Sequence, residues 1–260
     1  MSQLARIVAA AGRRRRWTPA ALGSALVRWY DVLDPRAGLG ALNAGDPVAS
    51  VADLSLAATA ATAAGAARPT YQPTAWTGGL PCWRTAGGTQ WLRCGSLALG
   101  PHVAVAVGKW SNGGVVFEHS ADVIGDTNGS WCWTTNAGPS AYVKRGGVAA
   151  GRDAAVGWAS SNVPTVVCMT FDGTNAGTLL YANSLAPIAT TASGGSTDVG
   201  TASSGARALA LSANDGGGRP LNGDWFAFAL VDATSRVAAI PAIAARLITY
   251  YARRARVTLT

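Results

Sequence analysis

The chain has 260 residues, among them 32 glycines, 12 prolines and 10 tryptophans, and only 13% of its residues are charged. This composition favours many turns around an aromatic core over long solvated helices, and the length suits one large β-sandwich or two small domains. No apolar run reaches the roughly 18 residues of a membrane-spanning helix. The apolar residues 7–11 precede the arginines of 13–16, the reverse of the order in a secretory signal, so we expect no export signal.

The formal net charge of +8 comes almost entirely from arginine, because Lys109 and Lys144 are the only lysines. A nucleic-acid binder is one interpretation of this charge balance. The arginines are scattered, however, and gather only at the two ends of the chain, so we expect no nucleic-acid partner.

Residues 1–16 form a basic arm that precedes a single predicted domain at residues 17–260. The arm is either a disordered terminus or a segment that docks on an acidic neighbour in an assembly. For the second alternative, the predicted assembly contacts are the basic residues at both ends and the first tryptophan: Arg13, Arg14, Arg15, Arg16, Trp17, Arg253 and Arg254.

The first half of the domain contains short predicted strands. Residues 26–31 form one, and the Ala/Thr/Gly tract at 57–67 is predicted to be an exposed loop. Strands at 80–84 and 90–93 flank Gly87-Gly88, which predicts a hairpin. Cys82 and Cys94 would flank that hairpin and could pair, although a reduced state is the expectation for a protein assembled in a cytoplasm.

A second hairpin is predicted at residues 101–119. After Pro101 and His102, valine alternates with alanine at 103–107, which is typical of a strand buried on both faces. The strand continues to Trp110, and the Asn112-Gly113-Gly114 turn predicts a return strand at 115–119.

The stretch 164–184 is the clearest β signal in the chain. Residues 165–171 are apolar on both faces, which predicts a strand buried on both sides with Cys168 as a small buried hydrophobe. A turn at 172–177 then leads to a second strand at 179–181. Further strands are predicted at 208–212 and at 223–231.

The hydrophobic period changes near the C-terminus. Apolar residues recur at helical spacing from Ile240 to Tyr251, which predicts a helix over about 240–254. Pro241 suits the first turn, and Arg253-Arg254 suit the last because cations there complement the helix dipole.

Several of these segments resemble a known family. Asp172-Gly173 followed by Leu180-Tyr181 and Asn183 is similar to the central hairpin of concanavalin A-like (laminin-G-like) jelly rolls, with Ser184 in place of the usual glycine. Further family positions, in chain order, are Trp29, Asp31, Val48, Asp53, Ser55, the Arg68-Pro69-Thr70-Tyr71 segment, the strand at 223–231, and Leu247 with Tyr250. Val51 and Leu56 depart from the pattern.

The resemblance spans roughly residues 26–252 and is to jelly rolls of the kind found in tailed-bacteriophage virion proteins. It implies an all-β fold: a two-sheet antiparallel jelly-roll sandwich closed by a short C-terminal helix. Fold alone does not determine function, so the candidate chemistry is considered residue by residue.

The sequence does not predict catalysis. Glycosidases on this fold use paired carboxylates, and Glu118 is the only glutamate, with no carboxylate two residues away. Glu118 and His119 are adjacent on a strand and would face opposite sides. A Ser–His–Asp site is equally hard to build around His102, because no serine lies in a nucleophile elbow. We therefore expect a protein that is not an enzyme.

A carbohydrate site is conceivable in one loop-rich region. Sugar-binding proteins combine aromatic faces with polar side chains, often beside a calcium ion held by Asp and Asn oxygens. The candidate ligand-binding residues of this type are Asp122, Asp126, Asn128, Trp131, Trp133 and Asn136. The alternative is that the tryptophans belong to the core and the other residues shape turns. The four cysteines show no zinc-ligand spacing, and no cofactor is predicted, calcium being an alternative without support.

The functional prediction is a non-enzymatic phage virion structural protein, such as a decoration, head–tail or fibre component. It would be assembled in the host cytoplasm as an oligomer, with other virion proteins as partners. The alternative is a carbohydrate-binding module that attaches to a host cell-surface glycan.

Overall fold

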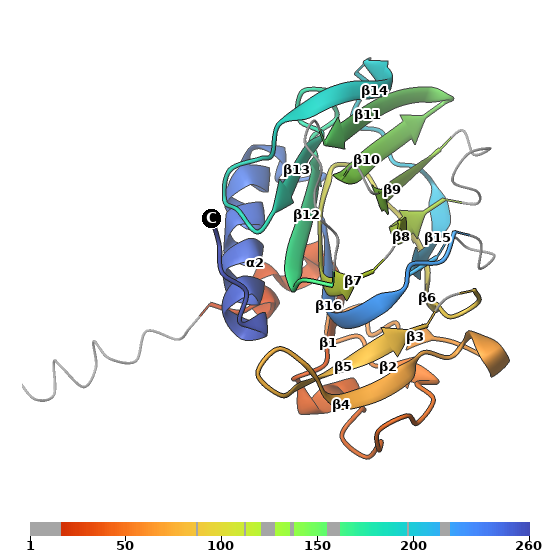
Figure 1. The fold of residues 1–260 in the computed structure, drawn as a ribbon. Helices are drawn as coiled ribbons and strands as arrows, with labels where there is room; N and C mark the ends of the chain where they lie inside the picture. The colour runs from red at the N-terminus through yellow and green to blue at the C-terminus, as the bar shows by residue number, and fades with distance from the viewer. Residues whose placement is uncertain are drawn as a thin grey trace, which may run out of the picture.

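The computed structural model describes residues 17–86, 88–111, 113–120, 128–135, 138–154, 162–196, 198–213 and 219–260. These residues form two antiparallel β-sheets and a C-terminal helix, α2 (Ile240–Ala255), as the sequence predicts (Figure 1). Short 3-10 helices precede the first strand (η1, Pro19–Ala25), follow it (η2, Pro35–Ala37) and lead into α2 (η4, Val237–Ala239). The tract at 57–67, predicted to be an exposed loop, also contains a two-residue strand, β3 (Ala61–Thr62), with Ala61 fully buried, and a 3-10 helix (η3, Gly65–Ala67). The loop prediction is therefore wrong for these residues, because β3 pairs with two strands of a sheet.

The seven-stranded sheet lies between the other sheet and α2. Its order is β13 (Leu179–Ala182), β12 (Thr165–Phe171), β7 (His102–Trp110), β16 (Gly223–Asp232), β5 (Leu80–Thr85) and β4 (Thr70–Trp76), with β1 (Leu26–Asp31) also paired to β16. All seven residues of β12 are buried, which confirms the prediction of a strand covered on both sides. β12 and β13 pair as the predicted hairpin.

The nine-stranded sheet forms the opposite layer. Its order is β14 (Thr190–Ser196), β11 (Val148–Ala154), β10 (Gly138–Arg145), β9 (Gly129–Thr135), β8 (Gly114–His119), β15 (Ala206–Leu211), β6 (Leu92–Ala98), β3 (Ala61–Thr62) and β2 (Ser50–Val51). Alternate residues of its strands face the other sheet, and Cys132 on β9 is fully buried there. The residues between them face away from the sandwich.

Two predicted hairpins are wrong. β7, which ends at Trp110, belongs to the seven-stranded sheet, and β8, which begins at Gly114, belongs to the nine-stranded sheet. β5 and β6 are likewise in different sheets. Gly114 begins β8 where a Cβ atom would lie only 2.5 Å from the carbonyl oxygen of Pro220, so this glycine allows a close crossing of two chain segments. Glycine there indicates tight packing and not a two-residue turn.

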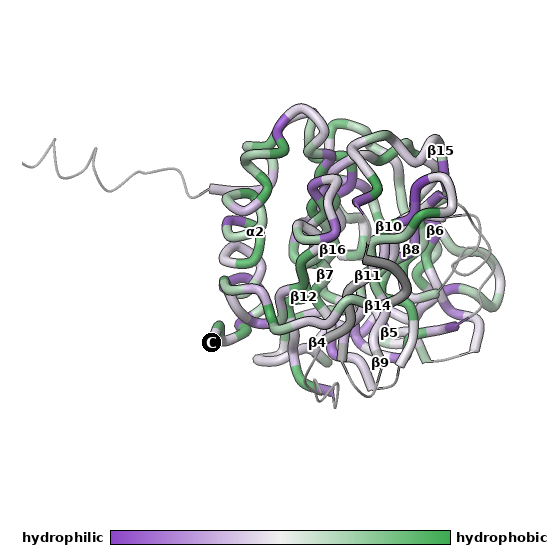
Figure 2. The backbone as a smooth tube through the Cα atoms, turned by 90° about the horizontal axis from the view of Figure 1, so that it is seen from above, coloured by the Kyte–Doolittle hydropathy of each residue, from purple (hydrophilic) through white to green (hydrophobic). Residues whose placement is uncertain are grey.

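The helix α2 covers the outer face of the seven-stranded sheet, where it packs on β12 and β7. Hydrophobic residues line β12 and β7 next to α2, while α2 itself alternates hydrophobic and hydrophilic residues (Figure 2). The buried residues recur at helical spacing: Ile240, Ile243, Ala244, Leu247, Ile248, Tyr251, Ala252 and Ala255. In the described part of the chain, no helix is long and apolar enough to span a membrane.

Two polar contacts attach the end of α2 to the sheet. Arg254 donates from Nε to Oδ2 of Asp31 at 2.6 Å, and Asp31 is fully buried at the end of β1. The Trp76 indole donates to the carbonyl of Ala255 at 2.8 Å. Burial raises the pKa of Asp31, although the hydrogen bond from Arg254 opposes that rise.

Asp53, near the N-terminus of the domain, has a structural role. Asp53 accepts hydrogen bonds from the backbone N–H groups of Trp29 and Ser55, both at 2.9 Å, and from that of Thr59 at 3.1 Å. One carboxylate therefore holds the loop after β2 against β1, which accounts for an aspartate at this position of the pattern.

All four cysteines are free and fully buried. Cys82 on β5 and Cys94 on β6 lie in different sheets and form no disulfide. Burial raises the pKa of Cys82, Cys94 and Cys132 to about 12, and raises that of Cys168 as well. The thiols are protonated parts of the core.

A polar layer with two histidines lies inside the sandwich. His102 donates from Nδ1 to the carbonyl of Gly100 at 2.9 Å, so its Nε2 accepts from the Ser130 hydroxyl, also at 2.9 Å. His119 donates from Nε2 to the carbonyl of Leu97 at 2.7 Å. Burial lowers the pKa of His102 to about 3 and that of His119 to about 4.

Arg145 is a buried cation in the same layer. Its guanidinium donates to the carbonyls of Gly129, Lys144, Leu99 and Ala202 at 2.7–3.0 Å. Burial lowers the pKa of Arg145 to about 10, so it remains protonated at neutral pH. Its charge adds to burial in keeping both histidines neutral.

The Asp31–Arg254 pair predicts a strong contrast between two neighbouring arginines. Arg254→Ala would leave a buried carboxylate without its cation and should lower the free energy of unfolding by about 3 kcal/mol. Arg253→Ala, at an exposed position of the same helix turn, should change it by no more than about 0.5 kcal/mol. Urea denaturation measures both, and equal losses would contradict the role given to the pair.

The buried histidines predict that the protein is destabilised by mild acid. Because their pKa values are lower in the folded than in the unfolded state, stability is complete above pH 6.5 and falls as the pH drops toward 4. At pH 5 each histidine should cost about 1–2 kcal/mol relative to pH 7. In urea denaturation series at several pH values, His119→Asn should show a shallower pH dependence than the wild type, and an unchanged slope would contradict this assignment.

Candidate functional site

The predicted sugar-binding residues divide into two groups. Asp122, Asp126 and Asn136 lie outside the described residues. Asn128 precedes β9, and its Oδ1 accepts from the backbone N–H of Gly146 at 2.9 Å, so part of its bonding capacity fixes the turn between β10 and β11. Trp131 and Trp133 lie on β9, two residues apart on the same face.

That face points away from the core of the sandwich. Cys132, between the two tryptophans, is part of the main core, whereas Trp131 belongs to a separate small cluster. We call this the aromatic cluster, and its members share the outer face of the nine-stranded sheet: Val115, Trp131, Trp133 and Tyr142. The alternative that the tryptophans belong to the core holds in part: Trp131 is buried in this small cluster, but neither tryptophan belongs to the main core between the sheets.

The geometry of the aromatic cluster follows from the strand register. Tyr142 on β10 is opposite Trp131, and their rings stack at 5.5 Å with an angle of 15°. Trp133 meets the same tyrosine edge-on at 6.1 Å. Trp131 is only 4% exposed, so it forms the base of the cluster. Trp133 and Tyr142 are half-buried and present the accessible aromatic surface.

Two cations flank the cluster. The guanidinium carbon of Arg219 lies 4.9 Å from the ring centre of Trp133, and Nζ of Lys144 lies 5.5 Å from that of Trp131. Arg219 is exposed and has a left-handed backbone (φ 51°), a conformation that costs a non-glycine residue energy. Aromatic faces beside charged hydrogen-bond donors are suited to ligands that combine apolar faces with hydroxyl or acidic groups.

The acidic residue nearest to the cluster is not arranged for catalysis. Glu118 pairs with Trp131 across β8 and β9 but is fully buried and accepts a hydrogen bond from Ser120. His119 points to the opposite face, toward Leu97, as expected for neighbours on a strand. His102 and Ser130 form a histidine–serine pair, but both are fully buried, and the histidine is oriented by a carbonyl and not by a carboxylate.

Within the described residues, no group of three or more His, Cys, Asp or Glu side chains is arranged to hold a metal ion. The suggested calcium ligands Asp122 and Asp126 fall outside that part of the chain.

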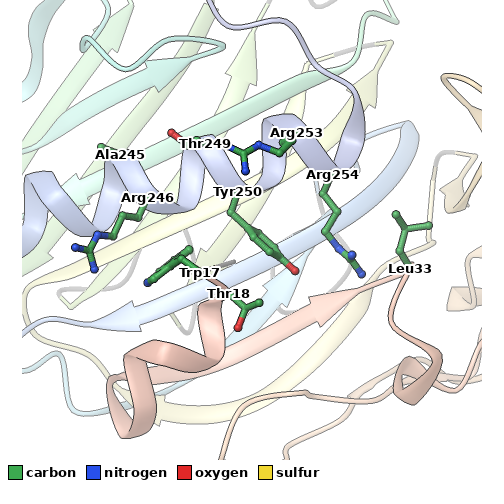
Figure 3. Close-up of a pocket in the computed structure, with 9 residues that line it drawn as sticks. All are labelled: Trp17, Thr18, Leu33, Ala245, Arg246, Thr249, Tyr250, Arg253 and Arg254. Carbon is green, nitrogen blue, oxygen red and sulfur yellow. The ribbon is translucent and has the colours of Figure 1, made fainter. Parts of the chain in front are cut away.

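A second candidate site lies on the other side of the molecule. A groove of about 830 Å³ runs between α2 and the segment that leads into β1 (Figure 3). We call it the α2 groove, and its lining combines aromatic, apolar and basic residues: Trp17, Thr18, Leu33, Ala245, Arg246, Thr249, Tyr250, Arg253 and Arg254. The structure thus brings together Trp17, Arg253 and Arg254, three predicted assembly contacts from opposite ends of the chain. Arg13–Arg16 lie outside the described residues.

Sequence reasoning did not identify several residues of both sites. Tyr142 lies on β10, next to β9, and Arg219 lies in the loop before β16. The one sequence signal that could have indicated Tyr142 is the matching alternation of residues on β9 and β10. Arg246 and Tyr250 line the α2 groove, and their spacing from Arg253 on one helix face could have indicated them.

No protein-family model and no curated protein matches the chain. Among solved structures, the IT-sialidase CBM40 of Ruminococcus gnavus bound to α2,3-sialyllactose matches 56% of this chain and 83% of its own, with 16% identity and a TM-score of 0.38. Domain 4 of AbnA, a GH43 extracellular arabinanase of Geobacillus stearothermophilus, in complex with arabinotriose, matches 83% of this chain and 98% of its own, with 13% identity and a TM-score of 0.49. At these identities the likeness concerns the fold alone.

Proposed function

We propose that the chain is a non-catalytic carbohydrate-binding module that binds glycans on the outer face of its nine-stranded sheet. The observation that carries this proposal is the aromatic cluster, in which Trp133 and Tyr142 are partly accessible. Aromatic rings on a rigid sheet can stack on the apolar face of a sugar ring. Arg219 and Lys144 supply charged donors for hydroxyl or carboxylate groups at its edge.

The rigidity of this face supports binding. Trp131 is almost fully buried and stacked against Tyr142 on the neighbouring strand, so the tyrosine ring loses little conformational freedom when a ligand binds. The half-buried state of Trp133 and Tyr142 leaves apolar area that a sugar ring would cover.

The absence of catalysis is part of the proposal. The only glutamate of the chain shares the face of Trp131 but is fully buried there beside Ser120, and His102 and Ser130 are fully buried as well. A carboxylate that transfers a proton to a glycosidic oxygen must be able to contact it.

A virion structural protein is the second candidate. The resemblance of the sequence motifs implies this role, and one structural observation favours an assembly function: Trp17, Arg253 and Arg254 meet in the α2 groove. The two candidates use opposite sides of the molecule and are compatible in one protein.

Substitution of Trp133 tests the carbohydrate proposal. Native affinity gel electrophoresis against a panel of neutral and uronic acid-containing polysaccharides would identify a ligand by retarded migration. Trp133→Ala should then weaken binding at least about tenfold, since that factor corresponds to about 1.4 kcal/mol of lost aromatic contact.

Trp91→Ala is the matched control. Trp91 is also a half-buried tryptophan next to an arginine, with Arg93 at 5.5 Å, but it precedes β6, away from the cluster. Its binding should equal that of the wild type. Equal losses in both variants, or no retardation by any polysaccharide, would refute the proposal.

A further inference from the structure

The α2 groove carries positive charge that the described residues do not neutralise. Arg246 and Arg253 are exposed, and no ion pair joins either to a described carboxylate. They are seven residues apart on α2, so they lie on one helix face about 10 Å apart along the axis. The lining contains no aspartate or glutamate.

Arg254 has a different role from these two arginines. Its Nε is bound to the buried Asp31, and its guanidinium lies 5.8 Å from the ring centre of Tyr250. It therefore fixes α2 and orients Tyr250, while Arg246 and Arg253 remain as donors toward a ligand. Figure 3 shows Tyr250 between Arg246 and Arg254, directed toward the segment that holds Trp17 and Thr18.

The floor of the groove is aromatic. Trp17 meets Tyr250 edge-on with ring centres 6.0 Å apart, and Leu33 adds an apolar surface at one end. Burial raises the pKa of Tyr250 to about 12, so its hydroxyl stays neutral and can donate or accept a hydrogen bond. The groove therefore combines an apolar floor with two arginines along one edge.

Charge disfavours the nearest alternative occupants. The first 16 residues contain Arg6 and Arg13–Arg16 but no acidic residue, so this segment is not complementary to an arginine-lined groove. A second copy of the chain would bring another surface with a net charge of +8. Bases of a single-stranded nucleic acid could stack on the aromatic floor, but its backbone is held by a longer run of basic residues than Arg246 and Arg253 supply.

We propose that the α2 groove binds an acidic peptide segment of a partner protein. Carboxylates of the segment would accept paired hydrogen bonds from Arg246 and Arg253, and an apolar side chain would lie on Trp17 and Tyr250. This interaction surface is separate from the proposed glycan site, because α2 and the aromatic cluster cover opposite faces of the sandwich.

The test uses a fluorescein-labelled peptide rich in glutamate with one central phenylalanine. Fluorescence anisotropy should show binding to the full chain, and a peptide with glutamine in place of every glutamate should not bind. The double variant Arg246→Ala/Arg253→Ala should weaken binding at least about tenfold, because each arginine would lose a charge-assisted hydrogen bond. Both positions are exposed, so an unchanged circular dichroism spectrum should accompany the loss.

The control is Arg93→Ala/Arg236→Ala, which removes two exposed arginines from outside both the groove and the aromatic cluster. It should bind the peptide within about twofold of the wild type, since surface charges at a distance are screened by salt. Equal weakening in the two double variants would show an effect of net charge alone and overturn the proposal. So would an absence of peptide binding, or displacement of the peptide by an equal concentration of oligothymidylate.

Discussion

The structure depends on the attachment of one helix to one face of one sheet. Asp31 and Arg254 join the first strand to the last turn of α2 by a fully buried carboxylate and a partly exposed guanidinium, and the indole of Trp76 binds the carbonyl of Ala255 beside them. Because α2 is held there, the seven-stranded sheet is covered on both sides. The apolar content of β12 on both faces is stable only under that cover. The nine-stranded sheet has no helix over it in the described part of the chain and keeps one face for polar and aromatic side chains.

The difference between the two sheets, one covered on both faces and the other on one, explains which parts of the fold were predictable from the sequence. Strands buried on both faces, such as β12 and β16, have unmistakable apolar runs, and α2 has a clear helical period. The connections were not predictable in the same way. A glycine-rich tract serves equally as a hairpin turn and as a connection between strands of different sheets, such as β7 and β8. The difference lies in what the chain meets in space, here the carbonyl of Pro220 near Gly114.

The candidate sites show the same division. Charge and aromatic content identified Trp133 and Arg253, because such residues are conspicuous in a chain with few charges. Their partners were hidden because Tyr142 and Arg219 reach the cluster only through strand pairing and loop placement. No local pattern joins Trp17 to a helix that begins more than two hundred residues later, and only the closed sandwich makes them neighbours.

The sealed thiols have a practical consequence. Every native cysteine is protonated and out of contact with solvent, so an alkylating reagent can reach one only when the sandwich opens. The rate at which the unmodified chain is alkylated therefore measures how often the sandwich opens. By the same reasoning, a single cysteine introduced on the surface would react alone, and a fluorophore or spin label could be placed there without removing any native residue.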